Sequence, residues 1–143
     1  MRTRSVLATA AAAGALLTAG MVSAASAAPV STGQSAAAVA PTVSPSADYF
    51  YTSGPGYVCP AGNLCARVWD PTVNKYKVFK FYNCNTYSLS NWEGTGGYGN
   101  SQTGSRATAT FYGQSGNVLK TVPVGVSTTS YNWSPVWKIR NCY

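Results

Sequence analysis

From Tyr49 onward, short runs of valine and aromatic residues alternate with Gly, Asn, Ser, Thr and Pro. This pattern is typical of strands joined by turns, and no window shows the i, i+3, i+4, i+7 spacing of an amphipathic helix. The sequence therefore predicts an all-β fold. The predicted strands cover residues 66–69, 76–82, 107–112, 118–122, 128–131 and 136–139, with hairpin connections at 70–74 and 113–117.

The strand pattern repeats along the chain. Three pairs of positions recur at nearly constant offsets: 42 from Trp69 to Phe111, 40 from Val78 to Val118 and 41 from Asn91 to Asn132. Such offsets favour two copies of one four-strand unit, although short β patterns also match by chance. Two copies would make a β-sandwich with aromatic residues buried at equivalent places.

The four tryptophans could pack in the core or form a platform for sugars. Trp92 and Trp133 occupy equivalent positions of the repeat, which favours core packing. Trp69 and Trp137 lie in predicted strands, where burial of their large rings is the expected role.

The first 27 residues have the composition of a secretion signal. Arg2 and Arg4 precede an apolar stretch over residues 6–22, and Ala25-Ser26-Ala27 supplies a cleavage site of small residues. A membrane anchor is the alternative, but the apolar stretch is short and rich in Ala. We expect a secreted, extracellular protein that has no membrane contact after cleavage.

A composition change separates a leader from the folded domain. Residues 28–48 are rich in Ala, Ser, Thr, Val and Pro, and all ten Tyr, four Trp and four Phe lie at or after Tyr49. A segment without aromatic residues cannot bury enough surface to offset its ordering entropy. Residues 28–48 are therefore predicted to be a disordered leader or linker, and residues 49–143 the β-sandwich domain.

Charge narrows the class of partner. The net charge is +7, and loss of the two signal-peptide arginines leaves +5. Nucleic-acid binders concentrate more basic charge than this, so a nucleic-acid partner is not expected. Lys75, Lys77 and Lys80 form a basic stripe, which is interpreted as a charged edge strand. The chain is expected to be a monomer.

The four cysteines are expected to be oxidised outside the cell. Four cysteines allow three pairings. We favour Cys59 with Cys65, across a turn-rich spacer, and Cys84 with Cys142. A zinc site is the alternative, but the chain has no His and no Cys-x-x-Cys pair, so no metal or other cofactor is expected.

Side chains for catalysis are scarce. Without His, the usual Ser-His and Cys-His nucleophile pairs are unavailable. The three acids are Asp48, Asp70 and Glu93, and a pair of facing carboxyl groups is not expected from them. Asp70, before Pro71, is interpreted as the cap of a turn. The protein is therefore predicted not to be an enzyme.

Residues 91–102 are the predicted interaction loop. The segment contains four glycines and offers Glu93, Thr95, Tyr98 and Asn100 as contact residues. Binding loops often combine Gly, Tyr and Asn in this way on a rigid scaffold, although plain loops have the same composition.

One motif resembles a known family. Cys59-Pro60-Ala61-Gly62-Asn63-Leu64-Cys65 resembles the opening of the secreted actinobacterial peptidase inhibitors of family thirty-six, typified by the streptomycete metalloproteinase inhibitor. The resemblance covers about residues 57–143 and implies two Greek-key units packed as a β/γ-crystallin-like sandwich, stapled by disulfides. Residues 100–105 also resemble the polar segment that precedes a strand in such domains, but Ser101 and Gly104 depart from the calcium motif.

The resemblance also implies a function, although this chain departs from the type inhibitor in one respect. It implies a proteinaceous peptidase inhibitor that binds an extracellular protease through a rigid loop. The type inhibitor presents its reactive bond in a second small disulfide loop, which this chain lacks because its remaining cysteines are 58 positions apart. The alternatives are a non-enzymatic binding module for a cell-wall polymer or carbohydrate, and an antimicrobial, toxin-like protein of the same fold.

Overall fold

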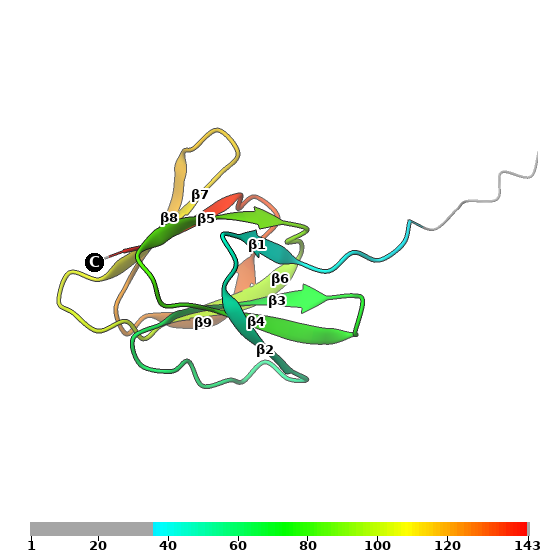
Figure 1. Ribbon diagram of the computed structural model, residues 1–143, viewed down its shortest axis with the longest axis horizontal. Coiled ribbons are helices and arrows are strands. Elements are labelled where there is room, and N and C mark those ends of the chain that lie inside the picture. Colours follow the sequence, from blue (N-terminus) through cyan, green and yellow to red (C-terminus); the bar gives the residue numbers. More distant parts are fainter. Residues whose placement is uncertain (1–35, 143) are drawn as a thin grey trace, which may run out of the picture. The chain divides into compact units, whose positions relative to one another are not determined.

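The described part of the chain forms ten β-strands in two sheets, which are drawn in Figure 1. The computed structural model describes residues 36–142, so the predicted signal and the start of the leader lie outside the described residues. The strands are β1 (Thr42–Ser44), β2 (Asp48–Thr52), β3 (Leu64–Asp70), β4 (Lys75–Phe81), β5 (Asn85–Ser90), β6 (Thr95–Asn100), β7 (Thr108–Tyr112), β8 (Val118–Pro123), β9 (Ser127–Asn132) and β10 (Lys138–Cys142). The all-β prediction is confirmed, and the described residues contain no helix that could span a membrane.

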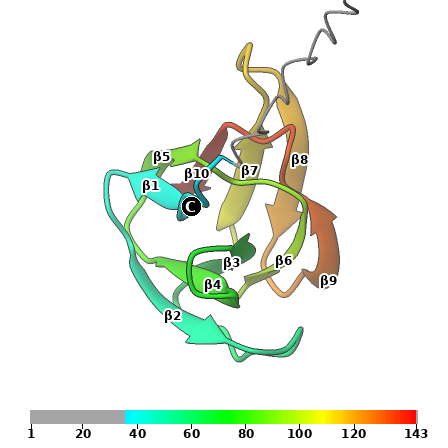
Figure 2. The same cartoon turned by 90° about the vertical axis from the view of Figure 1, so that its right-hand side faces the viewer.

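The strand order follows the sequence repeat. One sheet has the order β1-β5-β10-β7-β8 and the other β2-β4-β3-β6-β9, and all pairs are antiparallel (Figure 2). In β3–β6 the first two strands pair, the third lies in the opposite sheet, and the fourth returns beside the first. The strands β7–β10 do the same, so each four-strand unit contributes its third strand to the other unit's sheet.

Aromatic residues fill the space between the sheets. The rings of Trp92 and Trp133 meet edge to face with centroids 5.1 Å apart, and both side chains are buried. Each indole N–H donates to a backbone carbonyl, Trp92 to Thr42 (2.9 Å) and Trp133 to Arg67 (2.8 Å). Burial of large rings with their polar atoms satisfied confirms the core role predicted for these two tryptophans.

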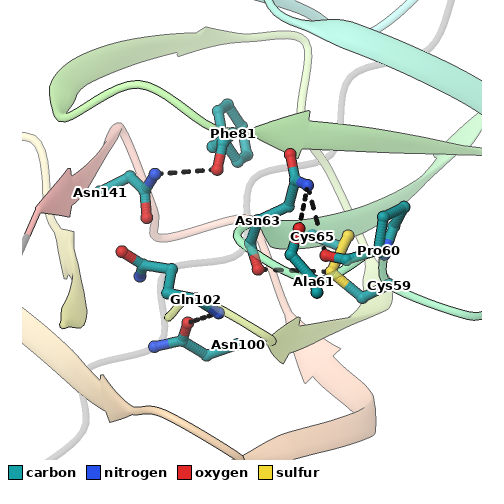
Figure 3. The surroundings of a disulfide bond; sticks show 9 residues. All are labelled: Cys59, Pro60, Ala61, Asn63, Cys65, Phe81, Asn100, Gln102 and Asn141. Carbon is teal, nitrogen blue, oxygen red and sulfur yellow. Dashed lines mark hydrogen bonds between the residues drawn. A yellow bond between two sulfur atoms is a disulfide. The ribbon is translucent and has the colours of Figure 1, made fainter. Parts of the chain in front are cut away.

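Two buried asparagines join the units. Asn100 and Asn141 are 41 positions apart at the ends of β6 and β10. The Asn141 amide donates to the Phe81 carbonyl of β4 at 2.8 Å (Figure 3), and the Asn100 amide donates to the Val122 carbonyl of β8, also at 2.8 Å. Val122 and Phe81 are also 41 positions apart. The repeat therefore extends to equivalent hydrogen bonds between the units.

The end of the predicted leader is part of the fold. β1 pairs with β5 and β2 with β4, so residues 41–52 extend both sheets on one side of the sandwich. Pro41 is fully buried, and its carbonyl accepts from Lys77 Nζ at 3.1 Å. The prediction of disorder over the whole of 28–48 is wrong at its C-terminal end, because backbone ladder bonds hold a segment that has little apolar surface.

The prediction that Lys75, Lys77 and Lys80 lie on an edge strand is wrong. β4 lies between β2 and β3 and is not an edge strand. Lys77 is only 7% exposed, and its ammonium lies 4.1 Å from the ring centroid of Tyr49. Lys80 forms an ion pair with Asp48 at 3.7 Å. Because β2 covers the strand, the lysine side chains pack and pair there instead of blocking a free edge.

Candidate functional site

Both predicted disulfides are present. Cys59 is bonded to Cys65, and Cys84 to Cys142. The first bridge lies at the start of β3, and the second joins the segment after β4 to the end of β10, so both lie at one end of the sandwich. Two disulfides in an all-β domain fit an extracellular protein.

The predicted interaction loop is mostly a buried strand. Residues Thr95–Asn100 form β6, which lies between β3 and β9, and Tyr98 and Asn100 are 4% and 2% exposed. A Cβ on Gly96 would collide with the Arg67 carbonyl. The glycines therefore allow close packing and do not indicate flexibility, so the prediction is wrong for Tyr98 and Asn100. Glu93, before the strand, and Thr95, its first residue, are exposed at the end of the sandwich away from the disulfides.

A different segment, residues 53–60, stands out as a surface feature. β2 ends beside Tyr76 at one end of the sheet, whereas β3 begins at the other end, so the connecting chain must cross the outer face of the sheet. It runs below β2 and β4 in Figure 1. We call residues 53–60 the strap. Its Tyr57 packs on Phe50 of β2 with ring centroids 6.4 Å apart.

Arg67 holds the strap against the sheet. This side chain lies on the outer face of β3 and is 2% exposed. Its Nη1 donates to the carbonyls of Pro55 and Gly54, and its Nη2 donates to the carbonyl of Thr129 in β9 at 2.8 Å. The guanidinium also lies 4.4 Å from the ring centroid of Tyr76. One buried cation thus joins the strap to β9 through charge-assisted hydrogen bonds.

The strap has an inner and an outer side. Tyr57 is half-buried, and burial raises the pKa of its phenol to about 12. Cys59 is fixed to β3 by its disulfide. Between them, Val58 is 85% exposed. The alternation therefore presents one apolar side chain to solvent between two anchored neighbours.

A groove of about 690 Å³ lies beside the strap. Tyr57 and Val58 line one side of it, and Val126 in the connection between β8 and β9 lines the other. That connection is fixed by hydrogen bonds from Gly125 N to the Asn100 carbonyl (2.8 Å) and from Asn100 N to the Val126 carbonyl (3.0 Å). Val124 and Val126 are 41% and 40% exposed. The groove thus has two firmly held rims that carry apolar side chains.

The groove is suited to binding through shape complementarity and apolar contacts. Among the described residues, no group of three His, Cys, Asp or Glu could hold a metal ion.

Asp70 is buried far along β3 from this groove, where it accepts from the Tyr51 hydroxyl (2.9 Å) and from the Thr72 backbone and hydroxyl. This confirms its interpretation as a turn cap. The sequence analysis did not identify the strap as a candidate functional segment. The position of apolar Val58 between Tyr57 and the disulfide-bonded Cys59 was a usable signal for it.

Comparison with protein-family models, with curated proteins and with solved structures finds nothing that matches this chain.

Proposed function

We propose that the protein is a secreted, non-enzymatic peptidase inhibitor with a β/γ-crystallin-like fold, and that the strap is the segment that enters the protease cleft. Support for the fold comes from the strand order, in which two four-strand units exchange their third strands as Greek-key units of that fold do. Support for the function comes from the Cys-Pro-Ala-Gly resemblance at residues 59–62 together with the geometry of the strap.

The observation that carries the proposal is the exposure of Val58 on an anchored segment. A protease binds its substrate as an extended strand and takes side chains into pockets. An inhibitor must occupy the same cleft without releasing its segment after binding. Arg67 anchors the strap before Val58, and the Cys59–Cys65 bridge anchors it directly afterwards. A segment ordered before binding loses little conformational entropy in the complex, which favours tight association.

The second rim of the groove would widen the contact. Val126, on the connection between β8 and β9, lines the same groove as Val58, and its neighbour Val124 is exposed on that connection. A protease that accepts Val58 would meet these side chains beside its cleft. Apolar anchors at the centre of an interface carry most of the binding energy, so Val58 is expected to dominate and the second rim to add less.

The test is an inhibition titration with the purified secreted protein against thermolysin-like and papain-like proteases. We expect slow-dissociating inhibition of at least one class. Val58→Asp should weaken inhibition by about thirtyfold or more, since a central apolar anchor contributes about 2 kcal/mol. Val73→Asp is the matched control, because Val73 is 47% exposed on the β3–β4 turn, away from the strap. Absence of inhibition, or equal loss in both variants, would refute the proposal.

A further inference from the structure

Two tryptophans lie exposed at the end of the sandwich away from the disulfides. Trp137 is 47% exposed and Trp69 is 37% exposed, which contradicts the burial expected of them from the sequence. This end gathers the β3–β4 and β7–β8 turns with the β5–β6 and β9–β10 connections. Exposed large apolar side chains that gather in one region mark a binding surface rather than a packing role.

Three adjoining hollows run across this end. The first, of about 450 Å³, is lined by Trp69 and shares Asn91 and Glu93 with the second, of about 640 Å³. The second shares Trp137 with the third, of about 500 Å³, which reaches Gln114 in the β7–β8 turn. The shared residues make a continuous track from Trp69 past Trp137 to the turn. We call it the tryptophan track.

The polar groups of the track select a type of ligand. Side-chain amides of Asn91 and Gln114 and the hydroxyl of Ser134 can donate or accept hydrogen bonds. Of the described residues that line the three hollows, Glu93 alone is charged. The lining of the track thus offers an anionic polymer no cation to pair with and one carboxylate that repels it, although the chain has a basic net charge. The surface suits a ligand with flat apolar faces and a rim of uncharged polar groups.

We propose that the tryptophan track binds a neutral polysaccharide chain of β-1,4-linked pyranose rings. In such rings the hydroxyl groups point outward and the axial C–H bonds leave two flat apolar faces. These faces stack on the indole rings of Trp137 and Trp69, while the amides and Ser134 bond to the hydroxyl groups. This binding site is separate from the strap, so the inference goes beyond protease inhibition and does not depend on it.

The indole of Trp137 is carried on an ordered backbone. Its backbone N–H donates to the Tyr112 carbonyl at 2.8 Å, and its carbonyl accepts from Leu89 N–H at 2.9 Å, so both neighbouring strands fix this residue. Trp69 meets Tyr76 edge to face with centroids 5.1 Å apart. Rigid aromatic side chains contribute contact area with little loss of conformational entropy.

The test is calorimetric titration of the purified secreted protein with chitohexaose, fully N-acetylated, and with cellohexaose. We expect one of them to bind and Trp137→Ala to weaken binding by about tenfold or more. Tyr82→Ala is the matched control, because Tyr82 is the most exposed aromatic residue in the part of the chain that the structure describes and lies at the disulfide end. The affinity of this variant should stay within about twofold of the wild type. No binding of either oligosaccharide, or equal loss in both variants, would overturn the proposal.

A second measurement covers the case in which Trp137→Ala fails to fold. In the wild-type protein, N-bromosuccinimide should oxidise Trp137 and Trp69 before the buried Trp92 and Trp133. Mass mapping should then show that the bound oligosaccharide protects Trp137 and Trp69. Oxidation of these two residues at an unchanged rate under saturating oligosaccharide would contradict the proposal. Val58→Asp should leave the protection intact, which separates this result from the inhibition test.

Discussion

Replacement of Arg67 by Met tests whether one buried cation holds the strap in place. The change keeps most of the aliphatic volume and removes the donors to the carbonyls of Pro55, Gly54 and Thr129. Loss of the charge-assisted hydrogen bonds to these three carbonyls, which leaves the carbonyls without partners, should destabilise the domain by about 3 kcal/mol. For a domain of this size, that corresponds to a fall of roughly 10–20 °C in Tm.

The assay is thermal and urea unfolding followed by circular dichroism, with limited proteolysis by a non-target protease in parallel. Arg67→Met should unfold at lower temperature and should be cut earlier within the strap. Arg140→Met is the matched control, because Arg140 is exposed on β10 and makes no hydrogen bond to the strap. If Arg67→Met changes stability no more than Arg140→Met, or the strap is cut no faster, the anchoring role assigned to Arg67 is refuted.

Three further predictions concern Tyr57, the two buried asparagines and the disulfides. Tyr57→Phe should stabilise the protein by about 1 kcal/mol at pH 7, since the Tyr57 hydroxyl is buried without a partner. The pKa of Tyr57 is raised to about 12, so between pH 10 and 12 the phenol ionises in the unfolded chain but not in the folded one. The free energy of unfolding should therefore fall as pH rises through this range. Tyr57→Phe should reduce that fall, as measured by urea unfolding. Asn100→Ala and Asn141→Ala should each cost about 1–3 kcal/mol by denaturant unfolding, in similar amounts, because each leaves an equivalent carbonyl without its donor. Removal of the Cys84–Cys142 bridge should cost roughly 4 kcal/mol against roughly 2 kcal/mol for the short bridge, measured by the same unfolding assay, because the longer loop gains more entropy in the unfolded chain.

The sequence revealed the parts of the fold that depend on apolar alternation and on the repeat. All six predicted strands overlap observed ones, and the 41-residue spacing of Trp92 and Trp133 identified the central aromatic pair. The disulfide pairing also followed from the sequence, because a local cysteine pair leaves only one partner for each remaining cysteine.

The missed elements depend on contacts that leave little trace in the sequence. β1 is held by ladder bonds to β5, and β6 looks like a loop because its glycines allow close approach of Arg67 and Thr128. β5 was missed although Tyr87 and Leu89 alternate with polar residues. The exposure of Trp69 and Trp137 depends on the strand ends where they lie, and that of Val58 depends on the path of the strap across the sheet. An apolar run reveals neither.

The location of the first cut made by an inhibited protease tests the central claim most directly. The wild-type protein is incubated in excess with a protease that it inhibits, and the slowly formed fragments are mapped by mass spectrometry. If the strap occupies the cleft, the first cut lies between residues 55 and 60, next to Val58. A first cut in the β7–β8 turn or in the β8–β9 connection, with the strap intact, would contradict the account.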